Sequence, residues 1–360
     1  MTTRTLSDFG LPTNLPLPRR REWRIGVIGL GGISRAHLPA YRSAGWKIVA
    51  ASDLDPARRE AAQQEYQIAQ VHEDYRRMID DPAVDVISLL TQPSVREEIV
   101  AACAEAGKSL LIEKPFALDL AACERMTAQA ERAGIRIAIN QNYRWLPAPF
   151  AAQGLLHGGW IGSPYFASIE IHGTQDRELA THPFYSRCRD FLTVQWNSHL
   201  ADLIRGFMGR DPQRVLARTS RMPGQNFVSD NVLTSVVDFG ADGTGVILHN
   251  ECHGGGLGTH AVRIEGTAGT VSFPLWGTTL TIASNRIDSG PVVLDCAPEG
   301  FLNSFCGPMA DLLRSLEDGT EPQISARRNL TTIRHVLGED ASAREGATWH
   351  ALETSTAGEG

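Results

Sequence analysis

The chain has 360 residues, of which 42% are hydrophobic and 21% are charged, a balance typical of globular proteins and not of disordered chains. This length is sufficient for two domains of ordinary size with well-filled cores. The formal net charge of -7 argues against broad binding to nucleic acid or to acidic membranes. No stretch of the sequence is long and apolar enough to predict a membrane-spanning helix.

Cysteine usage and the one basic run together predict a cytoplasmic protein. The six cysteines are scattered without paired spacing, which favours reduced thiols over a disulfide framework. The run Arg19–Arg21 invites a twin-arginine export interpretation. However, the apolar stretch behind it is short, is broken by glycine and forms the first predicted strand of the main fold, so we do not expect export.

Residues 1–22 contain several prolines and predict an extended N-terminal arm that lies over the surface or over a neighbouring subunit. The stretch that follows, RIGVIGLGGIS at Arg24–Ser34, predicts a buried strand, a sharp glycine turn and the start of a helix. The spacing of the glycines is close to the dinucleotide pattern G-x-G-x-x-G, with serine in the last place. Glycine lets a phosphate approach the backbone, and a helix start favours an anion. The residues expected to bind a dinucleotide pyrophosphate are therefore Gly29, Gly31, Gly32, Ile33 and Ser34.

Asp53 ends the second predicted strand, at the place where the dinucleotide fingerprint requires an acid about 20 residues after the glycines. A carboxylate there binds the hydroxyl groups of the adenosine ribose and would repel the extra 2′-phosphate of NADP. The next residue, Leu54, offers no cation to hold that phosphate. NAD is therefore the predicted cofactor, with NADP less favoured.

Strands and helices alternate through residues 23–146, which predicts an NAD-binding Rossmann domain with a doubly wound parallel sheet. Residues 147–360 have a different character, with strand-like runs joined by glycine-rich turns. They predict a C-terminal α+β domain with a large, mostly antiparallel open sheet that binds substrate and mediates oligomerisation. The first domain has expected strands at 24–29, 46–52, 84–91, 109–115 and 135–142 and helices near 56–65, 94–106 and 119–133. The second has expected strands at 164–173, 232–240, 243–252 and 261–273 and helices near 193–208, 302–317 and 327–337.

Ligands of a doubly wound sheet lie at the carboxyl ends of its strands, so Thr91, Gln92, Glu113–Pro115 and Gln141–Arg144 should face the cofactor crevice. Lys114 can reach the nicotinamide and a substrate hydroxyl from such a place, although exposed lysines without a function are commoner. His199 lies four residues after Gln195, on the same face of an expected helix. It suits a general base, with a core histidine as the alternative.

The sequence HNECH places His249, Glu251 and His253 on one face of an expected strand. Such a face could bind a metal, but a strand that lines a polar pocket is the favoured interpretation, and we predict no metal site.

These segments together resemble the glucose-fructose oxidoreductase and inositol dehydrogenase family, also called Gfo/Idh/MocA. The resemblance rests on GVIGLGGIS, LLTQPS, AGKSLLIEKPFAL, NQNYRWLP, HLADLIRGFMG and IEGTAGTV, and it spans about residues 24–337. It implies a Rossmann domain, a second domain whose open sheet commonly forms the subunit interface, and hydride exchange between a nicotinamide cofactor and a sugar, polyol or related hydroxy compound.

The resemblance also implies roles for single residues. Lys114 matches the motif lysine that positions the reacting hydroxyl, and His199 matches the usual acid/base. Asn142, Arg144 and Gln195 fall at or near positions that face the substrate. There are two departures from the family pattern: Arg96 stands where a histidine is frequent, and Gln195 stands where inositol-type members carry aspartate. We expect the first departure to touch the chemistry little and the second to affect the substrate and the acid/base coupling.

The favoured function is an NAD-dependent dehydrogenase of a sugar or polyol, working as a homodimer or homotetramer through the C-terminal sheet. One alternative is an enzyme with tightly bound NAD that performs internal redox without net oxidation. The other is a non-enzymatic NAD-sensing regulator of the same fold, but such a sensor has no need of a proton-transfer pair such as Lys114 and His199.

Overall fold

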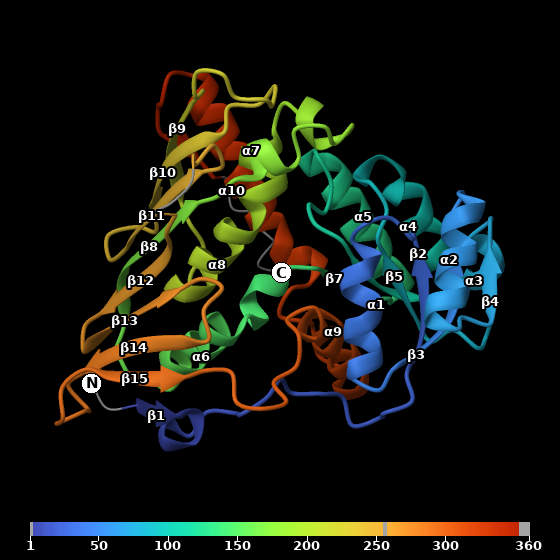
Figure 1. Cartoon of the computed structure of the whole chain (residues 1–360), viewed down its shortest axis with the longest axis horizontal. Helices are drawn as coiled ribbons and strands as arrows, with labels where there is room; N and C mark the ends of the chain where they lie inside the picture. The colour runs from blue at the N-terminus through green and yellow to red at the C-terminus, as the bar shows by residue number, and fades with distance from the viewer. Residues whose placement is uncertain (1–2, 255–257, 353–360) are drawn as a thin grey trace. The chain divides into compact units, whose positions relative to one another are not determined.

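The computed structural model describes residues 3–254 and 258–352, and the chain divides into two compact units (Figure 1). One unit contains residues 14–145 and 302–330, and the other contains residues up to 13, residues 146–301 and those from 331 onward. Residues 1, 2 and 353–360, which the arm and the C-terminal domain predictions include, lie outside the described residues. Each unit is described here by itself.

The first unit is built on a six-stranded sheet in which every neighbouring pair is parallel. The strand order is β4-β3-β2-β5-β6-β7, so the order reverses next to β2, as in dinucleotide-binding sheets. β5 and β6 are buried along their whole length, which agrees with their mostly apolar sequences, each of which has one serine. The strands are β2 (Arg24–Ile28), β3 (Lys47–Ser52), β4 (Gln70–His72), β5 (Val86–Leu89), β6 (Ser109–Ile112) and β7 (Ile137–Ile139).

Helices connect these strands, and their ends follow local sequence signals. Asp55 and Asp119 cap α2 and α5 by accepting hydrogen bonds from the N–H groups of Ala57 (2.9 Å) and Ala122 (2.8 Å). Gly134 ends α5 in a left-handed conformation, with φ of 69°. The helices of this unit are α1 (Ser34–Ser43), α2 (Pro56–Tyr66), α3 (Arg76–Ile79), α4 (Arg96–Glu105), α5 (Leu120–Ala133) and α9 (Cys306–Asp318), with short 3₁₀ turns η2 (Pro93–Val95) and η3 (Asn142–Trp145).

The second unit is built on a ten-stranded sheet of order β1-β15-β14-β13-β12-β8-β11-β10-β9-β16. Its pairs are antiparallel except for β1 with β15 and β8 with β11, so the prediction of a large, mostly antiparallel sheet is confirmed. Alternate residues of β8 are buried, which means that one face packs on the core of the unit. The strands are β1 (Thr3–Thr5), β8 (Pro164–His172), β9 (Arg214–Ser220), β10 (Val232–Asp238), β11 (Thr244–Asn250), β12 (His260–Gly266), β13 (Gly269–Pro274), β14 (Thr279–Ser284), β15 (Val292–Asp295) and β16 (His350–Ala351).

Helices α6 and α8 lie along one side of this sheet in Figure 1. α6 starts at Pro147, in the first helical position that proline favours, where the sequence had predicted only a boundary. The helical elements are η1 (Leu6–Phe9), α6 (Pro147–His157), α7 (Gln175–Glu178), η4 (Tyr185–Arg187), η5 (Phe191–Trp196), α8 (Ser198–Met208) and α10 (Ala326–Arg344), whose first five residues fall in the other unit.

The helix expected near 193–208 is divided, which corrects the prediction. Residues Phe191–Trp196 form a π-helix, η5, and α8 begins only at Ser198. The wider turn is visible in its hydrogen bonds, because the N–H of Gln195 binds the carbonyl of Asp190 (3.2 Å), five residues back. Gln195 and His199 therefore do not share the face of one regular α-helix.

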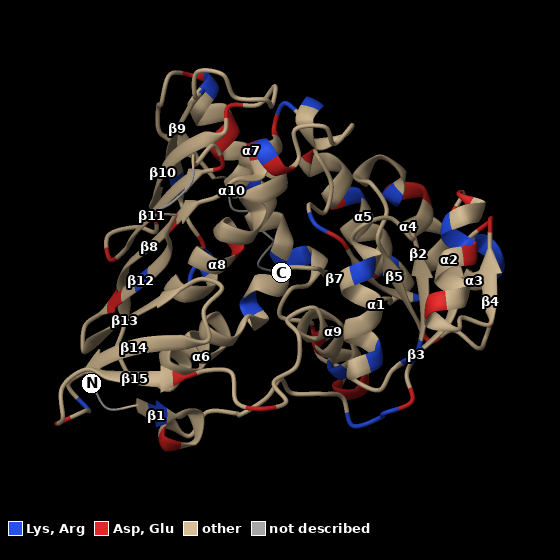
Figure 2. Cartoon of the chain, in the orientation of Figure 1, with Lys and Arg blue, Asp and Glu red and all other residues tan. Residues whose placement is uncertain are grey.

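Basic and acidic positions are mixed along α2 and α4 (Figure 2). All six cysteines are free thiols, as the sequence predicted. Within residues 3–254 and 258–352, no helix has the length and apolar character needed to cross a membrane.

Asp311, on α9, is a buried carboxyl group with an unusual titration. Burial raises its pKa to about 6, although hydrogen bonds from the N–H groups of Gln323 (2.7 Å) and Ile324 and the charge of Arg144 lower it. The folded chain therefore holds this proton more tightly than the unfolded chain, in which an aspartate titrates near pH 4. Stability contributed by this group is present below about pH 4 and is lost as the pH rises through about 6.

We therefore expect Asp311→Asn to gain stability relative to the wild type as the pH rises from 4 to 7, by up to about 3 kcal/mol. Urea unfolding of both proteins across this range measures the difference. Asp318→Asn, which changes an exposed carboxylate at the end of the same helix, is the control and should show no such slope. Parallel stability curves for the wild type and Asp311→Asn would contradict the assignment.

Candidate active site

The glycine turn that follows β2 has the geometry of a phosphate-binding loop. Gly29 has φ of 95°, and a Cβ there would lie 3.1 Å from the carbonyl carbon of Leu90, so only glycine fits. Gly31 differs, because a Cβ on it would meet only Nη1 of Arg58, at 3.9 Å. The space beside Gly31 is therefore open on the side where a ligand would approach.

The helix that follows offers unpaired donors at the same place. Among the described residues, none accepts a hydrogen bond from the N–H groups of Gly31, Gly32 and Ile33. α1 begins at Ser34, whose hydroxyl is buried and donates to the carbonyl of Gly31 (2.7 Å). Free N–H groups and a helix start together favour an anion. All five residues expected to bind the pyrophosphate thus lie in one turn that suits it.

Asp53 lies directly after β3 and ties the glycine turn to that strand. One carboxylate oxygen accepts a hydrogen bond from the N–H of Leu30 (2.7 Å), and the other accepts one from the N–H of Asp55 (2.9 Å). A carboxylate has about four acceptor positions, so capacity remains for the hydroxyl groups of a ribose. The guanidinium of Arg58 lies 3.7 Å from the same carboxylate. This cation was not predicted from the sequence, where only the next residue, Leu54, was considered.

Thr91 and Gln92 follow β5, the neighbour of β2 on the other side of the reversal in strand order. The hydroxyl of Thr91 is buried and has no hydrogen-bond partner within the described part of the chain. An unpaired buried hydroxyl is costly unless a ligand completes it. This feature and the open glycine turn both fit a dinucleotide that crosses the ends of β2 and β5.

Glu113, directly after β6, is the centre of a buried hydrogen-bond network. One carboxylate oxygen accepts from Nε2 of His37 (2.6 Å) and from the side-chain amide of Asn140, while the other accepts from the N–H of Lys114 (3.1 Å). Burial alone would raise the pKa of Glu113, but the bond from His37 and the charges of His37, Lys114 and Arg96 hold it below its usual value. Glu113 is thus an ionised carboxylate committed to its protein partners.

Lys114 is half-buried, and its pKa is lowered from that of an ordinary lysine. Burial is the main cause; the charge of Glu113 acts in the opposite direction, and the charge of Arg96 lowers the pKa further. The lysine therefore lies at the carboxyl end of β6 in an environment that makes its proton easier to remove. A lysine with a shifted pKa at a strand end is a candidate for a functional group.

Asn142 and Arg144 lie in η3, directly after β7. Asn142 is buried, and its amide donates to the hydroxyl of Ser304 (3.2 Å). The charge of Arg144 acts on Asp311, so both residues have protein partners in this unit. The first unit therefore gathers at the strand ends all predicted cofactor residues and two of the three predicted substrate residues.

His199 and Gln195 belong to the second unit and are both buried. His199 is the second residue of α8, and Gln195 lies in η5. Packing fixes these elements, since Leu192 contacts Ala217 and Leu233 of the sheet while Val194 contacts Val336 of α10.

A buried polar network reaches the start of α8 from α10, and sequence analysis missed it. Asn197, two residues before His199, donates from its amide to the carboxylate of Glu339. His335 lies 3.3 Å from the other oxygen of that carboxylate, and all three side chains are at most 1% exposed. Asp202, in the next turn of α8, accepts a long hydrogen bond from the hydroxyl of Thr332 (3.4 Å). The helical spacing of His335 and Glu339 was the signal available in the sequence.

The HNECH residues do not form a metal centre. His249 and Glu251 pair through Nε2 and a carboxylate oxygen at 2.7 Å and are buried, while the ring of His253 lies against that of His172. In the described ranges no group of three or more histidine, cysteine, aspartate or glutamate side chains is arranged to hold a metal. Burial lowers the pKa of the neighbouring His260, and Glu251 opposes that effect. The buried pair is a structural polar cluster.

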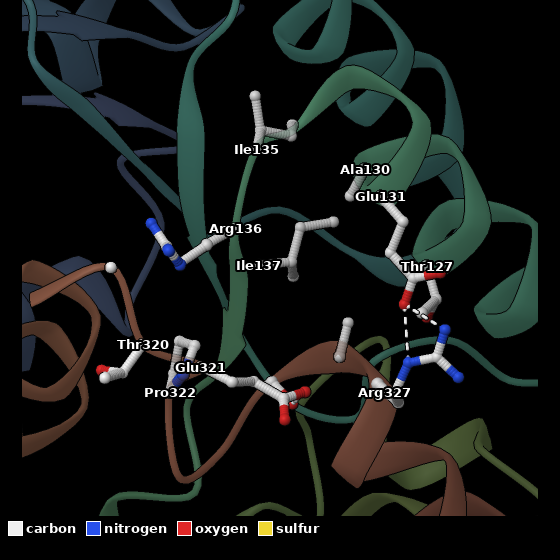
Figure 3. Close-up of a pocket in the computed structure, with 13 residues that line it drawn as sticks. Thr127, Ala130, Glu131, Ile135, Arg136, Ile137, Thr320, Glu321, Pro322 and Arg327 are labelled. Carbon is white, nitrogen blue, oxygen red and sulfur yellow. Dashed lines mark hydrogen bonds and ion pairs between the residues drawn. The ribbon is translucent and has the colours of Figure 1, made fainter. Parts of the chain in front are cut away.

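A pocket of about 280 Å³ lies beside β7 (Figure 3). Its lining includes Ile135, Arg136 and Ile137 from the amino end of β7, and the ion pair between Glu131 and Arg327 (2.7 Å) borders it. The predicted cofactor residues follow the carboxyl ends of the strands, so this pocket is not the dinucleotide site. A hollow of about 600 Å³ beyond Asp53, lined by Leu54 and residues 71–77, does adjoin that site.

Residues 23–141 match the model of the oxidoreductase family with NAD-binding Rossmann fold, Gfo/Idh/MocA. These residues form an NAD-binding Rossmann domain of the Gfo/Idh/MocA family. The matched range contains every predicted cofactor residue. The resemblance seen in the glycine turn and in the EKP sequence is thus confirmed, and so is NAD as the cofactor.

More distant similarity extends over nearly the whole chain. It is 29% identical to D-apiose dehydrogenase of Paraburkholderia graminis, over 91% of this chain and 89% of that protein. It is 25% identical to myo-inositol 2-dehydrogenase of Thermotoga maritima, over 84% and 90%. An Agrobacterium radiobacter oxidoreductase, solved with NAD+, L-tartaric acid and magnesium, superposes with a TM-score of 0.83 at 22% identity, over 92% and 98%. The last comparison shows the shared fold.

Removing Asp53 or Arg58 should change the preference for NAD over NADP in opposite directions. Asp53→Ala should narrow the preference for NAD over NADP, because the carboxylate repels the 2′-phosphate. Arg58→Ala should widen it, because the guanidinium near Asp53 is removed and no longer offsets that repulsion. Values of kcat/KM for both cofactors measure this, with Arg125→Ala on α5 as the control. A wild-type enzyme that favours NADP, or equal shifts in both variants, would contradict the prediction.

Proposed function

We propose that this oxidoreductase oxidises a hydroxyl group of a sugar, a polyol or a related hydroxy compound with NAD. The observation that carries the proposal is the position of Lys114 at the carboxyl end of β6, in the same sheet as the glycine turn and Asp53. The related D-apiose and myo-inositol dehydrogenases support this class of substrate. When bound, the nicotinamide of NAD+ accepts a hydride from the carbinol carbon.

The protein's contribution is proton transfer and charge stabilisation. Oxidation of an alcohol to a carbonyl releases a hydride and a proton, and His199 accepts that proton as the general base. Lys114, in its protonated form, donates a hydrogen bond to the reacting oxygen and stabilises the negative charge that develops there. Asn142, Arg144 and Gln195 contact other hydroxyl groups of the substrate and orient it. No metal ion takes part in this scheme.

The lowered pKa of Lys114 sets the alkaline limit of this scheme. Burial disfavours the charged lysine, so the ammonium group loses its proton at a lower pH than a free lysine does. Activity for alcohol oxidation therefore rises as His199 becomes neutral and falls as Lys114 becomes neutral. The result is a bell-shaped profile of kcat/KM whose alkaline limb lies below the usual range of lysine.

Copies of this chain are further proposed to form a homodimer or homotetramer through the open sheet of the second unit. Tyr165 and Leu248 are exposed apolar residues of β8 and β11, neighbouring strands of that sheet. Tyr165 also donates to Glu265 (3.0 Å), which pairs with Arg263, so the face is mixed in polarity, as subunit interfaces are. Sedimentation equilibrium tests the proposal, and a monomer at micromolar concentration would contradict it.

A screen of sugars, sugar acids and inositols for NADH formation at 340 nm tests the function directly. Turnover of at least one compound that depends on added NAD is the expected result. Protein that purifies with stoichiometric, non-dialysable NAD and forms no free NADH would indicate internal redox. NAD binding with no turnover of any compound would indicate a regulator.

Variants of the two central residues should separate catalysis from cofactor binding. We expect Lys114→Ala and His199→Ala each to lower kcat by about 10²- to 10⁴-fold while the Kd for NAD changes little, because both act on the reacting hydroxyl. Lys47→Ala and His157→Ala change an exposed lysine and an exposed histidine and serve as matched controls. Near wild-type turnover in either test variant would mean that the residue is not catalytic.

A further inference from the structure

Arg96, the first residue of α4, is among the largest fully buried side chains and is 2% exposed. A buried guanidinium carries a fixed charge, and its N–H groups must all be satisfied. Its donors reach the carbonyl oxygens of four residues that follow β5 or β6. Nε and Nη2 donate to Thr91 (3.1 and 2.6 Å), and Nη1 donates to Glu113, Pro115 and Phe116.

Two of these acceptors flank Lys114 in the sequence. The carbonyls of Glu113 and Pro115 belong to the residues immediately before and after Lys114, so one Nη1 binds the backbone on both sides of it. The same guanidinium holds the carbonyl of Thr91, whose unpaired hydroxyl lies at the predicted cofactor site. Arg96 therefore joins the end of β5 to the loop that carries Lys114.

The charge of Arg96 also acts on Lys114. Glu113 and Arg96 both influence this lysine, and they act in opposite directions. Glu113 favours the ammonium form, while Arg96 and burial favour the neutral amine. Because arginine does not lose its proton in the accessible pH range, its contribution is constant.

We propose that Arg96 is a positioning residue for Lys114: its guanidinium fixes the backbone on both sides of the lysine, and its permanent charge opposes that of Glu113 at the lysine ammonium group. That Arg96 contributes to turnover rests on the proposed function. That Arg96 positions Lys114 does not depend on it. The sequence analysis expected little effect from arginine at this position. The proposal departs from that expectation.

A histidine, frequent at this position in the family that the sequence resembles, could not replace all these contacts. Neutral imidazole has one N–H donor, whereas the guanidinium of Arg96 serves four carbonyls. Imidazole is also uncharged at alkaline pH, where lysine titrates. Arg96→His therefore removes the charge at alkaline pH, where lysine titrates. It introduces the residue that is frequent at this position in the family that the sequence resembles.

The test measures the protonation of Lys114 without any substrate. Brief labelling with trace acetic anhydride between pH 6 and 11, followed by mass spectrometry of the peptide that contains Lys114, reports how much of the lysine is the reactive free amine. Arg96→Met and Arg96→His should move the rise in labelling to higher pH. Arg96→Lys, which keeps a cation near the same carbonyls, should stay closer to the wild type. Arg125→Met, at an exposed arginine paired with Glu97, is the control and should leave the profile unchanged.

Turnover then separates this proposal from the proposed function. If a substrate is found, Arg96→Lys should lower kcat by on the order of 10²-fold, since misplacement of a catalytic group by about 1 Å has this effect. A labelling profile that stays at the wild-type pH in folded Arg96→Met and Arg96→His would overturn the proposal, whatever the enzyme's activity. A shifted profile in a protein with no dehydrogenase activity would keep the proposal and reject the proposed function.

Discussion

The carboxylate of Glu113 is the constraint on which the first unit depends. It accepts hydrogen bonds from His37 on α1, from Asn140 after β7 and from the backbone of Lys114, so three elements meet at one buried charge. Nε2 of His37 donates to this carboxylate, and Nδ1 of the same ring lies within hydrogen-bond distance of the hydroxyl of Tyr41 (2.8 Å). Removal of one partner from a buried charged pair typically costs about 3–5 kcal/mol, so this network also fixes the helix that starts at the glycine turn.

The second unit positions the predicted site residues His199 and Gln195 by different means. η5 packs its apolar residues on the sheet and on α10, and the wider π-helical turn ends where α8 begins, directly before His199. π-helical turns are rare in proteins, but those that occur are often found at functional sites. Their wider turn gives side chains directions that a regular α-helix does not. The carboxylate of Glu339, on α10, accepts a hydrogen bond from Asn197. A buried carboxylate therefore contacts the residue directly before α8, although residue 195 is an amide.

Local patterns were sufficient to predict the parallel sheet, the glycine turn and the acid at Asp53, because each depends on residues adjacent in the chain. The same holds for Lys114, which the EKP sequence places at a strand end. The contact of Arg96 with the EKP loop joins two separate segments, so it was not predictable from local patterns. The contact of Arg58 with Asp53 is local but depends on how α2 starts, which the sequence pattern does not specify. The division of the helix at 191–208 was missed because an apolar pattern of helical period does not distinguish an α-turn from a π-turn. β4 was missed because three residues carry too little pattern.

In the proposed reaction, hydride passes from a carbinol carbon to NAD while His199 accepts the proton and Lys114 stabilises the charge on the reacting oxygen. The most direct measurement uses the substrate identified by the screen, deuterated at the reacting carbon, and follows deuterium into the NADH by mass spectrometry. We expect the wild type to form NADH with one deuterium at C4 of the nicotinamide. His199→Gln should form the same deuterated NADH far more slowly. NADH that carries no deuterium, or labelled NADH formed at the wild-type rate by His199→Gln, would contradict the proposed reaction.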